Sequence, residues 1–476
     1  MHFVRRRSAI ILSALFCLSL SFGKTTHAQV PGVVDTFRVD VHEAIQRSLE
    51  VSPEVDAISS ELAFAEARKN LALASRFATE FNLQTAHAVA PGLDIPNPAV
   101  PTDELYLDPD VRNDWEDVRP FNRFEISLIQ PIYTWGELGG NIRAARFGVD
   151  VEKASVRAKE IEVARRTGDL YYGLLLAEAL ERLTAEAGDI LERAKSEIRR
   201  LLDEGAEDVD DADLFKVQIT EQEFLRRVVE VEQQLQTVRS ALELQLFLPP
   251  DTFFEPKDQI LTPIPLELDS LETYQAMALE VRPEIAQANA GIDAREALVD
   301  VARSSYFPKL FLGIDSRVTL TEGRFRQPNP YVNDPYRGRS LRAGLGLRLP
   351  LNFAQTHARV EQAEAERNEV RHQLIAAHQL IRYEVEDAYR TLITNRAAME
   401  AQDTALTIAE EWLRTEQINF DLDLGDTENL VDAVQSKLEL EATYYDRVRR
   451  YNASVLHLMA TTGTLVQRAQ SGTLVE

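Results

Sequence analysis

Apolar residues recur every three or four positions over residues 354–422, a stretch that contains neither proline nor glycine. This spacing predicts one amphipathic helix, which at 1.5 Å per residue would be roughly 100 Å long. A periodic run of this length is typical of a coiled coil, a membrane span or a repeat. Glu361, Arg367 and Glu369 exclude a membrane span, because their charges would lie in hydrocarbon. We therefore expect a rod with one packed face and one wet face.

A second rod of the same kind is predicted at residues 136–202. Each rod ends in an acidic turn that contains a glycine, Gly205 or Gly425, which suits a left-handed helix cap. A shorter stretch with helical periodicity follows each turn. We expect return helices at residues 214–247 and 427–462.

The order of elements occurs twice, at an offset of 230 residues. A short amphipathic segment, 41–50 or 271–280, precedes Ser52-Pro53-Glu54 in the first half and Arg282-Pro283-Glu284 in the second, and each tripeptide begins another helix. The duplication predicts a first structural repeat at 29–248, a linker at 249–268, a second repeat at 269–464 and a C-terminal tail at 465–476.

Strands are predicted between the second helix and the rod of each half, at 80–89 and 121–133 and at 309–321 and 340–349. In the last of these, leucines such as Leu341 and Leu345 alternate with Arg342, Gly344 and other small or charged residues. A two-residue period that is apolar on one side and polar on the other is what a lipid-facing barrel strand requires. Long segments, 90–119 and 322–339, are expected to be loops.

These elements predict a mainly α fold with a small β part, in which long helical hairpins are internally duplicated. Four strands cannot close a barrel of useful width, so strands must be shared between copies. Three copies would supply twelve strands, an even number as in bacterial barrels, and would place a sleeve of twelve helices below them.

Composition adds a location and excludes several chemistries. Arg5, Arg6 and Arg7 precede an apolar core and Thr26-His27-Ala28, which predicts a signal peptide at residues 1–28. The net charge of -25 argues against nucleic acid as a partner. Cys17, the only cysteine, lies inside the predicted signal, so disulfides and thiolate metal sites are not expected in the mature chain.

Several motifs resemble the TolC-like outer-membrane efflux protein family over nearly the whole mature chain. They are Gln130-Pro131-Ile132-Tyr133-Thr134-Trp135-Gly136, Arg282-Pro283-Glu284-Ile285, Tyr306-Phe307-Pro308, Arg450-Tyr451-Asn452 and Gly463-Thr464. The resemblance implies a homotrimer with a β-barrel in the cell outer membrane and a helical tunnel in the periplasm. It also implies docking on a periplasmic adaptor (membrane fusion) protein and an inner-membrane transporter.

The expected function is therefore the outer-membrane channel of a tripartite efflux or type I secretion system. The channel would be a passive conduit from periplasm to exterior, without enzymatic activity or a cofactor. A structural or adhesive envelope protein, in which the helices form a coiled-coil stalk without a pore, is the alternative.

Acidic side chains in the two turns between rod and return helix are candidates for the periplasmic entrance or gate. If three copies converge there, the ring of carboxylates would favour cations. Solvated turns whose aspartates cap the next helix are the simpler explanation. The candidates are Asp203, Asp208, Asp210, Asp211, Asp421, Asp423, Asp426 and Asp432.

Aromatic side chains flank the predicted strand ends, where a girdle would lie at the lipid headgroups: Tyr133, Trp135, Tyr306 and Phe353. Plain packing of the junction between barrel and helices explains them equally well. The histidines are scattered without a second ligand at metal spacing, so no metal site is expected.

Overall fold

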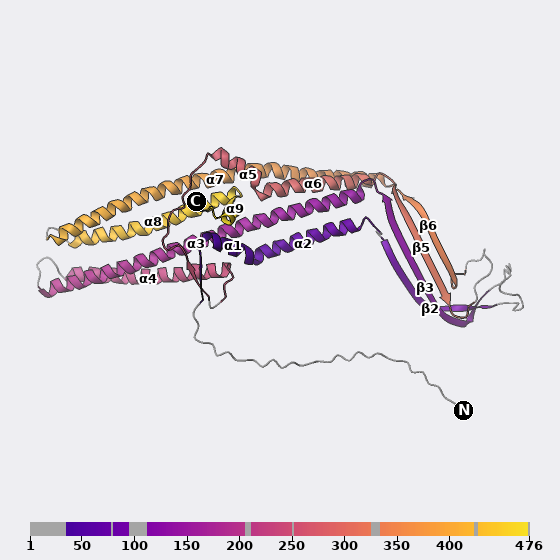
Figure 1. The fold of residues 1–476 in the computed structure, drawn as a ribbon, viewed down its shortest axis with the longest axis horizontal. Coiled ribbons are helices and arrows are strands. Elements are labelled where there is room, and N and C mark those ends of the chain that lie inside the picture. The colour runs from indigo at the N-terminus through magenta and orange to yellow at the C-terminus, as the bar shows by residue number, and fades with distance from the viewer. Residues whose placement is uncertain are drawn as a thin grey trace, which may run out of the picture.

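The protein is an elongated bundle of helices with a four-stranded sheet at one end (Figure 1). The computed structural model describes residues 35–77, 80–94, 112–204, 211–249, 252–324, 334–422 and 427–474. The predicted signal peptide lies outside these ranges. None of the helices in these ranges combines the length and the hydropathy that a membrane-spanning helix needs.

Each half begins with two short helices at the predicted offset. Helices α1 (Val41–Val51) and α2 (Pro53–Ala74) correspond residue for residue to α5 (Leu271–Val281) and α6 (Pro283–Ser304). Proline at the first position of α2 and α6 suits a helix start, because its missing N–H has no partner there. Ser52 caps α2 through its hydroxyl, whereas Arg282 pairs with Glu284 and Glu384 instead.

Two long helical hairpins form the body of the molecule. They consist of α3 (Glu137–Glu204) with α4 (Asp211–Gln245), and α7 (Phe353–Asp421) with α8 (Thr427–Thr461). Helix α3 is central, since it packs against α2 and α4 on one side and against α6 and α8 on the other. Figure 1 shows α7 along one margin of the bundle and α2 and α4 along the opposite margin.

The main sheet is antiparallel, in the order β2-β3-β5-β6. Its strands are β2 (Glu80–Asp94), β3 (Arg112–Tyr133), β5 (Lys309–Thr321) and β6 (Gly338–Arg348). The hairpin of the first half therefore pairs with that of the second half through β3 and β5. Strands β2 and β6 are the two edges of the sheet.

The linker between the halves is part of the core. Strand β1 (Asp35–Val39) pairs in parallel with β4 (Thr252–Pro256), and Phe254 of β4 is fully buried. Asn452 of α8, also fully buried, holds the next linker segment: its Nδ2 donates to the Thr262 carbonyl at 2.8 Å and its Oδ1 accepts from the Ile264 N–H at 2.8 Å. One amide thus satisfies two buried backbone groups.

Several predictions are corrected by the structure. Strands β2 and β3 extend to Asp94 and from Arg112, well into the predicted loop 90–119, because the ladder continues past a register shift between Pro91 and Gly92. Strands β1 and β4 were not predicted, and the tail contains helix α9 (Leu465–Ser471). The left-handed Gly463 turns the chain from α8 into α9, whose Leu465 is buried.

Candidate functional site

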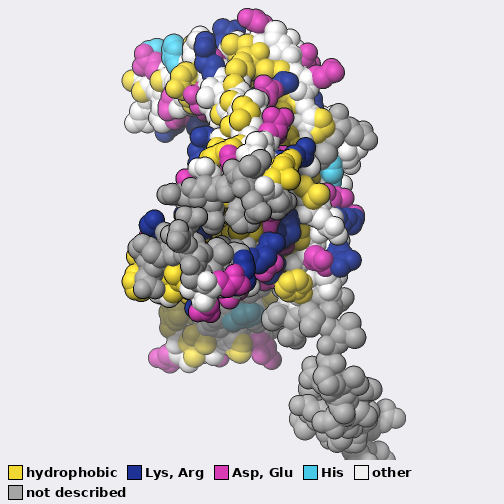
Figure 2. Space-filling model, turned by 90° about the vertical axis from the view of Figure 1, so that its left-hand side faces the viewer, with side chains coloured by type: hydrophobic (Ala, Val, Ile, Leu, Met, Phe, Trp, Pro, Cys, Tyr) yellow, Lys and Arg dark blue, Asp and Glu magenta, His cyan; other side chains and the backbone are white. Residues whose placement is uncertain are grey.

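The turns at the far end of the hairpins hold the predicted gate residues, of which two are described with their side chains. Asp203 lies exposed in the last turn of α3, and Asp432 lies exposed near the start of α8. Asp211 and Asp421 belong to the ends of α4 and α7, and Asp208, Asp210, Asp423 and Asp426 lie outside the described residues. Figure 2 looks onto this end, where acidic, basic and hydrophobic side chains are mixed. The gate assignments therefore stay predictions.

The main sheet has one apolar and one polar face. Neighbouring strands keep their alternation in phase: Leu128 pairs with Phe81 on one side and with Ile314 on the other. Many of the large side chains on the apolar face are well exposed in the single chain, Leu341 by 74% and Phe81 by 65%. A sheet with this exposed face would bury it in lipid or against another apolar surface. Its larger apolar members are Phe81, Leu83, Val89, Phe124, Ile126, Leu128, Leu310, Leu312, Ile314, Val318, Leu320, Leu341, Leu345 and Leu347.

The polar face carries charges and glycines. Arg317 donates to both oxygens of Glu125 at 2.8 and 3.2 Å, and Lys309 pairs with Glu137 of α3 at 2.5 Å. Gly346 leaves room for the Phe311 ring, since a Cβ at this position would collide with it, and the Arg348 guanidinium lies 5.3 Å from the centre of that ring. This face is suited to water.

The sheet and the helical body each have two open edges, and these lie on the same two sides of the chain. In the sheet they are β2 and β6; among the helices they are α2 and α4 on one margin and α7 on the other. The α4 margin carries an exposed apolar stripe that includes Phe215, Ile219 and Val229, and α2 exposes Phe64 and Leu71. Unpaired strand edges and exposed apolar stripes are typical of surfaces that bind another protein. Here both lie along the same margins of the chain.

The predicted aromatic residues lie where the sheet meets the helices. Trp135 has a left-handed backbone (φ 53°), stacks on Phe307 with ring centres 4.8 Å apart, contacts the Tyr133 ring and donates its indole N–H to the Pro308 carbonyl at 2.8 Å. Trp135 thus joins the β3–α3 turn of the first half to the α6–β5 turn of the second. These three rings are each about half exposed.

The other two aromatic candidates lie on the second-half side of the junction. Tyr306 Oη lies 3.4 Å from His357 Nδ1, and Phe353 begins α7 with its side chain 48% exposed. Packing of the junction therefore accounts for the contacts of Trp135. Because Tyr133, Trp135 and Phe353 are also partly exposed, an aromatic girdle at the lipid headgroups stays a proposal.

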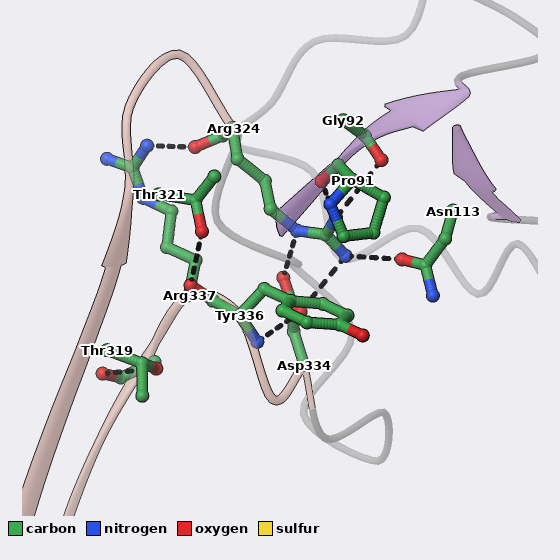
Figure 3. Close-up of polar contacts among 10 residues, drawn as sticks. Pro91, Gly92, Asn113, Thr319, Thr321, Arg324, Asp334, Tyr336 and Arg337 are labelled. Atoms are coloured by element: carbon green, nitrogen blue, oxygen red, sulfur yellow. Dashed lines mark hydrogen bonds and ion pairs between the residues drawn. The ribbon is translucent and has the colours of Figure 1, made fainter. Parts of the chain in front are cut away.

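A buried arginine at the other end of the sheet was not predicted (Figure 3). Arg324, with a side chain only 3% exposed, donates to the Pro91 and Gly92 carbonyls at 2.6 and 3.0 Å, to Asn113 Oδ1 at 2.8 Å, and to both oxygens of Asp334 at 2.9 and 3.0 Å. We call this the Arg324 cluster. It ties the end of the first hairpin to the end of the second.

The helical body contains half-buried titratable groups between α3 and α8. Burial lowers the pKa of His457 below its ordinary value of 6.5, and the nearby Arg165 adds to this. Burial raises the pKa of Asp169, although Arg165 pairs with it at 2.7 Å. Within the described ranges, no three His, Cys, Asp or Glu side chains are grouped so that they could hold a metal ion.

Comparison with known proteins identifies relatives that share this architecture. Residues 275–464 match the family model of the outer membrane efflux protein. The cobalt-zinc-cadmium resistance protein CzcC of Cupriavidus metallidurans is 21% identical over 392 residues, covering 78% of this chain and 84% of that protein.

Solved structures of outer membrane channels have the same fold. The CmeC channel of Campylobacter jejuni is similar with a TM-score of 0.67 and 15% identity, over 89% of this chain and 85% of that chain. The open state of the MtrE channel of Neisseria gonorrhoeae is similar with a TM-score of 0.69 and 13% identity, over 89% of each chain. These findings show that residues 275–464 match an outer membrane efflux protein domain and that the chain has the fold of the TolC-like outer-membrane channels.

Proposed function

We propose that three copies of the chain close into one tube, which serves as the outer-membrane channel of a tripartite efflux or type I secretion system. The tube is a passive conduit from the periplasm to the exterior and carries out no reaction. A periplasmic adaptor protein and an inner-membrane transporter complete the system, and the transporter supplies the energy.

The observation that carries this proposal is the agreement of open edges between the layers. A copy placed beside β6 and α7 would meet them with its own β2, α2 and α4. Because β2 and β6 run in opposite directions within the chain, the new pair would be antiparallel like the rest of the sheet. A head-to-tail contact of this kind generates a closed ring when the rotation is right.

The two faces of the sheet support a barrel rather than a stalk. Rolling the sheet with its apolar face outward places Leu341 and Phe81 in lipid and the Arg317–Glu125 pair in the water-filled interior. Three chains supply twelve strands, which is an even number as in other bacterial barrels. A stalk without a pore would leave the polar face without a function.

We further propose that the chain consists of a signal peptide at 1–28, repeats at 29–248 and 269–464, and a linker at 249–268. The positions of α1, α2, α5 and α6 support two repeats. The acidic turns are proposed as the periplasmic entrance, and Tyr133, Trp135, Tyr306 and Phe353 as the interfacial aromatic residues.

Conductance across a planar lipid bilayer tests the proposal. The purified protein should form channels, and Asp421→Asn, Asp423→Asn and Asp432→Asn together should reduce the preference for cations, because they remove charge from the entrance. Neutralising Asp56 and Asp293, which lie on α2 and α6 away from the turns, is the control. A protein that inserts into bilayers without conducting would support the stalk instead.

A further inference from the structure

The two edge strands of the sheet carry opposite charges on its polar face. Strand β6 carries Arg342 and Arg348 there and has no acidic residue, whereas Glu80 is the one acidic residue in the regular part of β2, residues 80–89. All three side chains are exposed, and none of them has an ion pair within the described part of the chain. Arg342 lies opposite Asp315 of β5 within the chain, whereas Lys309 lies opposite Arg348. If the chain forms the proposed trimer, the two edges meet and Arg348 can pair with Glu80 of the next copy.

The faces of the sheet restrict how the edges can pair. On both strands the polar side consists of even-numbered residues, such as Glu80 and Arg348, and the apolar side of odd-numbered residues, such as Phe81 and Leu347. A slip by one residue would place every leucine of β6 in the water-filled interior. Only registers that pair even-numbered residues of β2 with even-numbered residues of β6 are therefore allowed.

Among these registers, one pairs the whole of β6 with the part of β2 that precedes its register shift between Pro91 and Gly92. When Arg348 lies opposite Glu80, residues 338–348 pair with residues 80–90, so the ladder covers the strand from end to end. Phe81 then faces Leu347, and Leu83 faces Leu345, on the apolar side. A displacement in the opposite sense, with Ser340 opposite Glu80, would pair only the first three residues of β6.

The tilt of a closed barrel selects the same register. Within the chain, Glu80 is aligned through Ile129 and Gly313 with Gly344. Arg348 lies four residues beyond Gly344, so three such seams give a total stagger of twelve residues for twelve strands. A stagger equal to the number of strands corresponds to a tilt of about 36°, within the usual range of barrels. Gly346 opposite Glu80 would halve the stagger and leave the strands too upright.

Overlap, tilt and charge thus agree, and we infer that the seam between copies pairs β6 of one chain with β2 of the next so that Arg348 binds Glu80 of the neighbouring copy. The inference rests on the proposed trimer and specifies its register. The Arg348 guanidinium lies 5.3 Å from the centre of the Phe311 ring, which covers Gly346, so Arg348 is held on the polar face of the edge strand β6. This ion pair is incomplete in a single chain.

Cysteine cross-linking in membranes tests the register, with Cys17→Ser as the background. Glu80→Cys with Arg348→Cys should give linked dimers and trimers on oxidation, because directly opposite Cβ atoms lie about 5 Å apart. Glu80→Cys with Gly344→Cys should not, since its cysteines would be displaced by about 13 Å along the seam. Linking of the second pair, or of Glu80→Cys with Ser340→Cys, in place of the first would overturn the inference.

A charge exchange tests the ion pair without cysteines. Arg348→Glu should lower the temperature at which the trimer dissociates, and Glu80→Arg added to it should restore that temperature. Arg342→Glu, on the same strand and face, should not be rescued by Glu80→Arg. Equal rescue of both variants would contradict the pairing, as would a trimer in which no variant changes the dissociation temperature. A wild-type protein that is monomeric by mass would instead refute the proposed trimer.

Discussion

At the scale of single residues, the junction between sheet and helices depends on Trp135. Its strained left-handed backbone is held by a stack on Phe307 and by the hydrogen bond to the Pro308 carbonyl, both of which belong to the other half of the duplication. The tryptophan of the Gln130-Pro131 to Trp135-Gly136 motif thus binds a carbonyl that lies 173 residues further along the chain.

Trp135→Phe should destabilise the protein by about 1 kcal/mol, because it removes the indole N–H and leaves the Pro308 carbonyl without this donor while it keeps an aromatic ring. Thermal unfolding in detergent measures the loss. Trp412→Phe is the matched control, since Trp412 is similarly exposed and its indole N–H donates to Glu416 on the same helix. Equal effects of the two changes would show that the inter-half hydrogen bond adds nothing.

His457 should make the stability of the helical body depend on pH. Because its pKa is lowered in the folded state, the unfolded chain binds the proton more readily just below pH 6.5. The free energy of unfolding therefore falls as the pH drops through this window, by at most about 1.4 kcal/mol per pH unit. The raised pKa of Asp169 acts in the opposite sense. At pH values above 3.8 the folded chain binds this proton more readily than the unfolded chain, so the contribution of Asp169 to stability rises as the pH falls toward 3.8.

Chemical denaturation at pH 5, 6 and 7 checks the contribution of His457. His457→Gln should flatten the decline between pH 6.5 and 5, because glutamine does not titrate. The exposed His372→Gln is the control and should follow the wild type. The charged groups around His457 and Asp169 come from three helices. They are Arg165 and Asp169 of α3, Arg449 of α8, and Glu384 and Asp387 of α7. An unchanged pH profile in His457→Gln would contradict the assignment.

At the scale of elements, periodicity was enough to predict the long helices, because each rod repeats its pattern over many turns. The same holds for the alternating strands of the main sheet. It could not reveal β1 and β4, whose pairing joins residues 217 positions apart, such as Phe37 and Phe254. Prolines and aspartates in 90–119 suggested a loop, yet the ladder continues past Pro91, where the strand shifts register.

The Arg324 cluster shows a second limit of local patterns. Arg324 follows the end of β5 in a segment predicted to be a loop, and nothing next to it in sequence indicates burial. Its partners Pro91, Gly92 and Asn113 come from the other half of the chain. The register shift in β2 lies at the same two carbonyls that Arg324 binds, so the irregular strand end and the buried cation occur together.

Arg324→Ala should destabilise the sheet by about 3–5 kcal/mol, because it leaves the buried Asp334 carboxylate without a counter-charge. Arg317→Ala is the control: its pair with Glu125 is partly exposed, so its loss should cost about 1 kcal/mol or less. Heat-induced unfolding in detergent compares the two. Similar losses for both would mean that the Arg324 cluster does not tie the hairpins together.

At the scale of the whole molecule, the single chain is an incomplete object. Its apolar sheet face, its two strand edges and the apolar stripe of α4 are all exposed, although the helices share a continuous core that includes Tyr171, Leu392 and Leu456. The same margins are open in the sheet and in the helices. Three copies would close all of them with one repeated contact and would leave the polar face of the sheet around an interior passage.

The mass of the complex extracted from outer membranes tests this account most directly. Native mass spectrometry in detergent should show a single species with three chains at all concentrations above the micromolar range, because each chain has two large open margins to cover. Monomers that persist at these concentrations, with the sheet still folded, would contradict a tube formed from three copies.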